Sequence, residues 1–314
     1  MALAVYTQSI IAVIWDFDRT LIPAYSQEPI FEHFGVDGQQ FWGEVNALKR
    51  IYAARGLNVA EDTAYLLHML TYVESGEFEG LTNPLLRELG AKLEFCPGMP
   101  ELLSKLKDLV ATDDRYAKHD IQVEHYVVST GLRQLIEGSA VGEHLSGVWA
   151  NEFIDHPPPP GFDPDVHEFG EDPGPIARVG YMVDNTTKTR AIFEINKGKD
   201  IPVNALVAPE DRRIPIANMI YVADGPSDVP VFSVINQNGG RSLGVYQPSG
   251  VNYAGVKQLQ DEGRVHSTAP ADYTEGSQAY LWLTTTVREA ANRICDIRER
   301  KLASLKAPAG HVID

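Results

Sequence analysis

The sequence predicts an α/β fold, a doubly wound parallel sheet with helices on both faces, and three observations support this prediction. The run Ile10–Trp15 is apolar at every position, as in a strand that is buried on both sides. Segments 123–131 and 219–228 repeat this design, each an apolar stretch that ends in polar residues and glycine. Segments 96–109 and 278–305 carry apolar residues at the 3- and 4-residue spacing of helices. Strands that alternate with helices predict a parallel sheet.

Two aspartates follow the first predicted strand directly. Residues two apart in extended chain point the same way, so Asp16 and Asp18 can act on one reacting group. Open α/β sheets bind their ligands outside the carboxyl ends of the strands, which is where both carboxylates would lie. An ordinary acidic turn is the alternative.

Polar residues also follow the two later strands. Ser129 and Thr130 come at the end of segment 123–131. Asp224 ends the apolar part of segment 219–228, with Asp228 on or near the next helix. Each has an ordinary alternative, because Ser often caps helices and Asp is common in turns and caps.

A lysine lies in the first turn of a helix predicted within residues 184–198. Asn185 or Thr186 is placed to cap this helix, and Gly198 to end it. The helix dipole disfavours a cation in the first turn, so Lys188 indicates an anionic partner nearby. A solvated surface lysine is the alternative.

In order and context, these segments resemble the four motifs of the haloacid dehalogenase-like superfamily of hydrolases, and in layout its phosphoserine-phosphatase-like branch. The matches are DFDRT, VVST, Lys188 and DGPSD, and the resemblance spans about residues 10–246 with two interruptions. It implies a HAD-like, Rossmannoid core over residues 1–22 and 94–314. It also implies a helical cap inserted at 23–93 and a second insertion at 151–184.

The resemblance further implies a reaction and a role for each motif residue. Asp16 would attack a phosphoryl group to form an aspartyl-phosphate, and Asp18 would act as acid and base. Mg²⁺, a hard cation that prefers oxygen ligands, is the implied cofactor. The implied metal ligands are the side chains of Asp16 and Asp224 and the main-chain carbonyl of Asp18, with Asp228 orienting them. The implied phosphate-binding residues are Ser129, Thr130 and Lys188.

The sequence departs from the superfamily pattern near the first and fourth motifs. Arg19 stands where glycine is usual, and Ala223 and Ser227 replace the common Gly and Asn. None of these changes removes a reacting group. Arg19 could lend a cation to an acidic substrate, or it could point to solvent or pair with a cap carboxylate. Members that displace halide lack the second aspartate, so Asp18 favours phosphate chemistry.

The two insertions differ in character. Within the first, Ala64, Leu67 and Leu70 predict an amphipathic helix over part of residues 58–73. Three charged residues there could contact a substrate, with solvated surface positions as the alternative: Glu28, Arg50 and Arg55. In the second, segments 147–154 and 177–183 resemble the strands of a hairpin. They flank an acidic, Pro-rich loop at 155–175 whose role stays open.

Composition limits the partners. The 314 residues include 27 basic and 43 acidic ones, a formal net charge of −16, which argues against nucleic acid or an anionic membrane surface. Cys96 and Cys295 are the only cysteines, so no disulfide framework is expected. The N-terminus lacks the pattern of a signal peptide, and its apolar run is too short to span a membrane. We therefore expect a cytoplasmic protein.

These observations predict a Mg²⁺-dependent phosphohydrolase whose substrate is a small phosphate monoester. Two alternatives use the same site, a phosphotransferase or phosphomutase and a non-catalytic protein that binds a phosphorylated ligand. A receiver-type signalling domain is disfavoured, because such domains are shorter and lack the DGxxD segment after the lysine. The sequence names neither the ester nor the oligomeric state.

Overall fold

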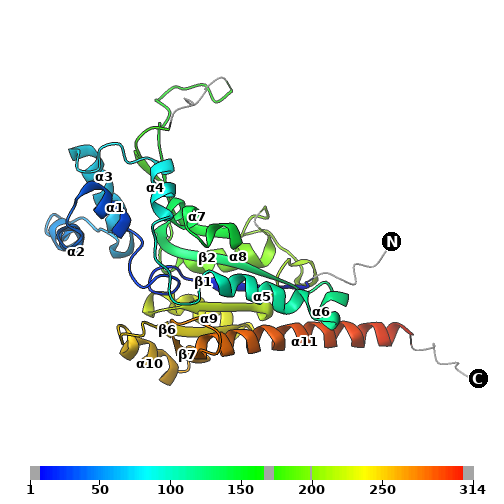
Figure 1. Ribbon diagram of the computed structural model, residues 1–314. Coiled ribbons are helices and arrows are strands. Elements are labelled where there is room, and N and C mark those ends of the chain that lie inside the picture. Colours follow the sequence, from blue (N-terminus) through cyan, green and yellow to red (C-terminus); the bar gives the residue numbers. More distant parts are fainter. Residues whose placement is uncertain (1–7, 166–172, 199, 307–314) are drawn as a thin grey trace, which may run out of the picture.

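The structure is a computed structural model that describes residues 8–165, 173–198 and 200–306. A single sheet runs through its centre (Figure 1). The seven strands have the order β4-β3-β2-β1-β5-β6-β7, and every neighbouring pair is parallel except β3 and β4. The order reverses at β1, so the sheet is doubly wound, as predicted. The strands are β1 (Ile10–Trp15), β2 (Gln122–Leu132), β3 (Leu145–Ile154), β4 (Arg178–Tyr181), β5 (Met219–Ala223), β6 (Arg241–Tyr246) and β7 (Ser267–Pro270).

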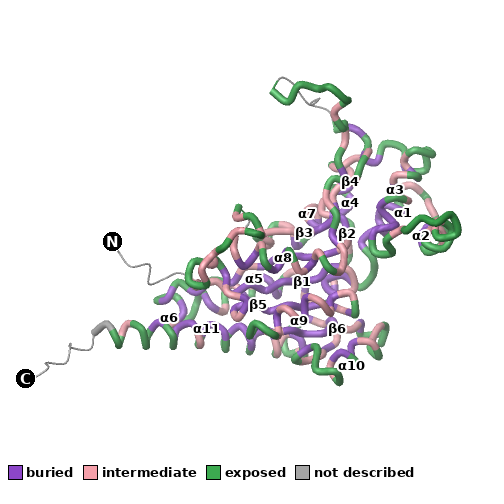
Figure 2. The backbone as a smooth tube through the Cα atoms, turned by 180° about the vertical axis from the view of Figure 1, so that it is seen from behind, coloured by how far each residue is buried: buried purple, intermediate pink, exposed green. Residues whose placement is uncertain are grey.

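Helices cover both faces of the sheet, which explains the unbroken apolar run of β1. Ile11, Val13 and Trp15 face one core, and Ala12 and Ile14 face the other. The first core is completed by α5 (Glu101–Ala111), α6 (Asp114–Lys118) and α11 (Gln278–Lys306). The second is completed by α8 (Thr187–Lys197), α9 (Val229–Gln237) and α10 (Tyr253–Asp261). In Figure 2 the strands run through the buried centre of the molecule.

The segment between β1 and α5 is helical and forms a third core, to which Leu132, Leu135, Phe153 and Ile176 also contribute. It comprises α1 (Glu28–Phe34), α2 (Gly38–Ala53), the 3₁₀ turn η1 (Glu61–Thr63), α3 (Ala64–Ser75) and α4 (Asn83–Gly90). Aromatic rings fill this core, with Phe31 and Phe41 4.9 Å apart between centroids. In Figure 1, α1, α2 and α3 stand beyond the end of β1 that leads into Asp16.

The predicted apolar stripe of α3 is wrong at Leu67, which is 53% exposed. The helix instead buries Tyr65, Met69 and Tyr72, together with Ala64 and Leu66. Large aromatic side chains bury more surface than leucine, so the helix turns its tyrosines toward the rings of α1 and α2.

Helices α4 and α7 (Arg133–Gly138) pack with their backbones in close contact. A Cβ atom on Gly138 would lie 1.9 Å from the carbonyl oxygen of Arg87, and one on Gly90 would lie 2.2 Å from that of Leu135. Glycine is therefore required at both positions. This contact fixes the end of the helical segment against the sheet domain.

Strand β3 belongs to the parallel sheet for most of its length. It pairs with β2 from Leu145 to Asn151, and only its last part, Glu152 to Ile154, pairs antiparallel with β4. Segment 147–154 is thus mainly a strand of the central sheet rather than of a separate hairpin. Of the loop at 155–175, residues 166–172 lie outside the described part of the chain. The remaining 3₁₀ turns are η2 (Gly142–His144), η3 (Pro209–Asp211), η4 (Ile216–Asn218) and η5 (Pro226–Asp228).

Two further observations concern the whole described chain. Among the described residues, every helix is too short or too polar to cross a lipid bilayer, including the 29-residue α11. Cys96 and Cys295 are both buried as free thiols. Burial raises the pKa of the Cys96 thiol to about 11, so it stays protonated.

Candidate active site

The carboxyl ends of β1 and β5 lie side by side where the strand order reverses. Trp15 pairs with Val222, and the Asp16 amide continues the ladder by donating to the Val222 carbonyl at 2.9 Å. Asp16 therefore follows one strand and Asp224 follows its neighbour. Such a crevice is where doubly wound sheets bind ligands.

Three carboxylates meet at this point. Oxygens of Asp16, Asp224 and Asp228 all lie within 4.8 Å of one another. Lys188 Nζ donates to Asp16 Oδ1 at 2.9 Å and to Asp228 Oδ1 at 2.7 Å. The lysine is only 1% exposed, so it is not a surface residue. The structure thus joins residues from the first, third and fourth motifs in one cluster.

The charges of this cluster do not balance. Burial raises the pKa of Asp16 well above its usual value; Lys188 opposes this, and the charges of Asp228 and Asp224 add to it. Burial, followed by the charge of Asp228, raises the pKa of Asp224 to about 7. Burial alone would lower the pKa of Lys188, but Asp16 and Asp228 outweigh it and raise that pKa. Three acids around one lysine are the donor set that a divalent cation fits.

Within the cluster, Asp228 has the fewest free lone pairs. Its Oδ1 accepts from Lys188 and from the Tyr221 hydroxyl at 2.5 Å, and its Oδ2 accepts from the Ser227 hydroxyl at 2.9 Å. These bonds fix the carboxylate and the lysine together. The residues present therefore fit a cation held mainly by Asp16 and Asp224.

Asp18 lies beside this cluster in a tight turn. Its Oδ1 accepts from the Ser26 amide at 2.8 Å. Burial raises the pKa of Asp18 to about 6, although the nearby hydroxyl and the amide of Ser26 act against the rise. The next residue, Arg19, has φ +58°, a left-handed conformation that favours glycine. A carboxyl group with this pKa can give and take a proton near neutral pH.

Ser129 and Thr130, at the end of β2, have different surroundings. Ser129 Oγ accepts from the Gly131 amide at 2.9 Å, which leaves its proton for another acceptor. The Thr130 carbonyl accepts from the Tyr65 hydroxyl of α3 at 2.6 Å. A methyl group on Gly131 would lie 3.1 Å from Ser26 Oγ, 3.2 Å from Ser129 Oγ and 3.6 Å from Asp18 Oδ2. Oxygens from three segments therefore surround one small position.

The cap of α8 differs from the prediction, because the side chains of Asn185 and Thr186 do not cap it. Asp184 Oδ1 accepts from the amides of Thr186 at 2.8 Å and Thr187 at 2.6 Å. These bonds, with that from Thr187 the strongest influence, lower the pKa of Asp184. A carboxylate at this end suits the helix dipole and anchors the turn that directs Lys188 inward.

Sequence reasoning missed a loop that contacts two motifs. Asn252, which follows β6, donates from Nδ2 to both the carbonyl and the carboxylate of Asp224. In the same loop, Gln247 Nε2 donates to the Arg19 carbonyl at 2.7 Å. The only sequence signal is the turn composition around Gly250, which agrees with the φ of +59° at Asn252.

Arg19 neither pairs with a carboxylate of residues 23–93 nor points fully to solvent. Its guanidinium lies 4.4 Å from the centroid of the Tyr25 ring, a cation–π contact. The Tyr25 ring in turn lies 5.5 Å from that of Trp42 in α2. The three charged residues that sequence analysis named in the first insertion are all exposed, namely Glu28, Arg50 and Arg55.

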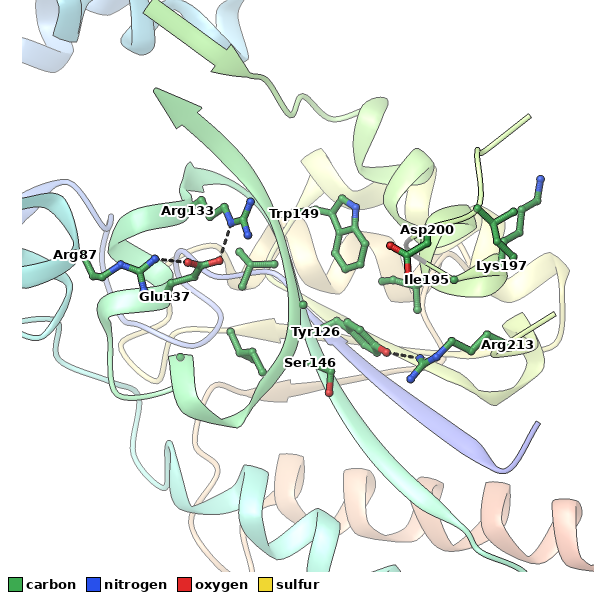
Figure 3. Close-up of a pocket in the computed structure, with 16 residues that line it drawn as sticks. Arg87, Tyr126, Arg133, Glu137, Ser146, Trp149, Ile195, Lys197, Asp200 and Arg213 are labelled. Carbon is green, nitrogen blue, oxygen red and sulfur yellow. Dashed lines mark hydrogen bonds and ion pairs between the residues drawn. The ribbon is translucent and has the colours of Figure 1, made fainter. Parts of the chain in front are cut away.

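A large cavity, of about 900 Å³, lies away from this cluster along the outer edge of β3 (Figure 3). None of the motif residues lines it. Its arginines are already paired, Arg133 with Glu137 at 2.6 Å and Arg213 with Glu124 at 2.6 Å. Cavity volume alone would therefore select a different place from the cluster of acids and lysine, which we take as the candidate site.

The fold recurs among solved structures. A "probable phosphoserine phosphatase" from Vibrio cholerae matches with a TM-score of 0.51 and 14% identity over 95% of this chain and 69% of that one. A hydrolase of the haloacid dehalogenase family from Salmonella enterica serovar Typhi matches with a TM-score of 0.48 and 13% identity over 84% and 67%. The chain has the haloacid dehalogenase-like fold, which confirms the fold and the resemblance predicted from the motifs.

Sequence comparison identifies a closer relative. No model of a known protein family matches the chain. An uncharacterized protein of Borreliella burgdorferi is 39% identical over 280 residues, which cover 88% of this chain and 96% of that protein. The chain belongs to the same family as that protein.

Proposed function

We propose that the protein is a Mg²⁺-dependent phosphohydrolase that cleaves a small phosphate monoester through an aspartyl-phosphate. The observation that carries this proposal is the buried contact of Lys188 with Asp16, in a cluster that also holds Asp224 and Asp228. The haloacid dehalogenase-like fold supports it, because the cluster lies at the end of β1 where that fold has its reactive aspartate.

The reaction has two steps. In the first, a carboxylate oxygen of Asp16 attacks phosphorus, the bond to the ester oxygen breaks, and Asp18 gives its proton to the departing alcohol. In the second, water attacks phosphorus and Asp18 takes the proton of that water. The bond between phosphorus and Asp16 then breaks and phosphate leaves. The pKa of about 6 at Asp18 suits both transfers.

The other residues bind and orient the phosphoryl group. Lys188 neutralises charge on Asp16 and on the phosphoryl oxygens. The hydroxyl of Ser129 and the polar groups of Thr130 donate hydrogen bonds to the same oxygens. Mg²⁺, held by the side chains of Asp16 and Asp224 and the Asp18 carbonyl, would neutralise the charge of the phosphate ester when bound. Asp228 positions Lys188 rather than reacting itself.

We assign residues 23–93 as a cap over this site and residues 1–22 and 94–314 as the core. The bond from Tyr65 in α3 to the Thr130 carbonyl supports this assignment, since it ties the cap to the end of β2. A cap in this place would exclude bulk water from the phosphoryl group.

Phosphate release from a panel of small esters, with Mg²⁺ or with a chelator, tests the function. Release should require Mg²⁺ and should vanish in Asp16→Asn, which removes the attacking oxygen's charge and leaves the fold intact. Asp211→Asn, an equivalent change at an exposed position in η3, should leave release unchanged. Undiminished release by Asp16→Asn would refute the assignment of the nucleophile.

A further inference from the structure

Unpartnered polar atoms gather where the cap begins. Among the described residues, eight buried side-chain nitrogens or oxygens have no hydrogen-bond partner, and four of these lie between residues 20 and 42. They are Thr20 Oγ1, Ser26 Oγ, Gln27 Oε1 and Trp42 Nε1. Buried polar groups in native proteins are nearly always paired, so a local excess of unpaired ones needs an explanation. A ligand that supplies the missing partners is one.

Two of these residues lie next to the candidate site. Ser26 Oγ borders the same narrow space beside Gly131 as Ser129 Oγ and Asp18 Oδ2. Its hydroxyl influences the Asp18 carboxyl without making a hydrogen bond of standard geometry. Gln27, only 3% exposed, has its amide against the Tyr65 hydroxyl, and its Oε1 remains without a donor.

Trp42, another of these four residues, lies among aromatic rings of the cap. Its ring centroid is 5.5 Å from that of Tyr25 and 5.9 Å from that of Tyr65. Both neighbours connect to the site, Tyr25 through the Arg19 guanidinium and Tyr65 through the Thr130 carbonyl. The indole N–H of Trp42 is therefore a buried donor in a mostly apolar wall beside the site.

We propose that Gln27 and Trp42 select the leaving group, and that this group is a neutral, polyhydroxylated one such as a polyol or sugar. The inference rests on the proposed phosphohydrolase function. Gln27 Oε1 needs a donor and Trp42 Nε1 needs an acceptor, and hydroxyl groups supply both. A plain alkyl group would leave both atoms unpaired. The Gln27 amide and the Trp42 indole are themselves neutral, so neither offers an ammonium group a counter-charge.

The test compares kcat/KM for two esters of similar size, glycerol 1-phosphate and propyl phosphate, with phosphoserine as a third substrate. The wild-type protein should prefer glycerol 1-phosphate over propyl phosphate by roughly tenfold or more, because a buried site built for a hydroxyl rejects the analogue without one. Gln27→Met and Trp42→Phe, which keep size and remove one polar atom, should each lower that ratio several-fold. Gln40→Met, the same change at an exposed position of α2, should preserve it.

Several results would overturn the inference: equal kcat/KM for glycerol and propyl phosphate, a preference for phosphoserine, or an unchanged ratio in both variants. Parallel loss toward both esters would assign Gln27 a structural role only. Failure of the proposed function is distinct, since then no ester, 4-nitrophenyl phosphate included, would be hydrolysed. In that case, the affinity for glycerol 1-phosphate is measured by calorimetry for the wild type and for Gln27→Met. Weaker binding by Gln27→Met would support the inference, and the same affinity in both proteins would overturn it.

Discussion

Asn252 holds Asp224 at two points, with Nδ2 donating to the main-chain carbonyl at 2.7 Å and to the carboxylate Oδ2 at 2.9 Å. Its own Oδ1 accepts from the Gln247 amide at 3.3 Å, and the Gln247 side chain holds the Arg19 carbonyl. The loop 247–252 therefore joins the turn after Asp18 to the acid after β5. It fixes the relative position of two segments that carry the proposed chemistry.

Replacing Asn252 should weaken metal binding. Asn252→Gly keeps a residue that tolerates the φ of +59° and removes only the side chain. Without the amide, Asp224 loses its orientation, and Mg²⁺ affinity measured by calorimetry should fall roughly tenfold or more, as for other groups that orient metal ligands. Ser249→Gly, an exposed change in the same loop, is the control for added flexibility. Equal affinity in both variants and the wild type would show that Asp224 needs no such support.

Filling the space beside Gly131 should impair catalysis without unfolding the protein. In Gly131→Ala, the new methyl group would lie 3.1–3.6 Å from Ser26 Oγ, Ser129 Oγ and Asp18 Oδ2, all ends of side chains that can shift. A displacement of this kind can lower kcat/KM for phosphate esters by roughly 100-fold. Gly255→Ala in α10 meets no atom within 4 Å and should keep full activity. Normal turnover by Gly131→Ala would place the phosphoryl group elsewhere.

The sequence predicted the strands and the acids that follow them for a physical reason. A strand buried on both faces must be apolar throughout, so polar residues at its end stand out, as Asp16 and Asp224 do. Lys188 was recognisable because a cation in the first turn of a helix needs an anionic partner, and Asp16 and Asp228 are those partners.

Features that depend on contacts distant in sequence were not predictable. The bond from Gln247 to Arg19 spans 228 residues, and neither residue has a local pattern that marks it. Leu67 fits the helical spacing as well as Tyr65 does, and only packing against the aromatic rings of the cap decides which one is buried. The role of β3 in the parallel sheet likewise depends on its pairing with β2.

Removing the buried ammonium should destabilise the fold. Lys188→Met leaves Asp16 and Asp228 without their shared cation, and loss of one partner from a buried pair costs about 3–5 kcal/mol. The loss, measured by urea unfolding, should be largest at pH 8. It should shrink toward pH 5, because burial already raises the pKa of Asp16 and its protonation removes the uncompensated charge. Lys257→Met, at an exposed ion pair, should change stability little, and an equal loss there would contradict the argument.

A buried histidine should make the protein sensitive to mild acid. Trp15 Nε1 donates to His125 Nδ1 at 3.3 Å, and His125 Nε2 donates to the Leu103 carbonyl at 2.9 Å, so this network requires the neutral ring. Burial lowers the pKa of His125 to about 3. Its contribution to stability is therefore complete above the unfolded pKa of about 6.5 and declines as the pH falls toward 3.

Between pH 7.5 and 5, the wild type should lose about 2 kcal/mol of unfolding free energy relative to His125→Gln. Urea unfolding at both pH values measures this difference, with His33→Gln on the surface of α1 as the control. The same pH dependence in wild type and His125→Gln would mean that His125 accepts a proton in the folded protein.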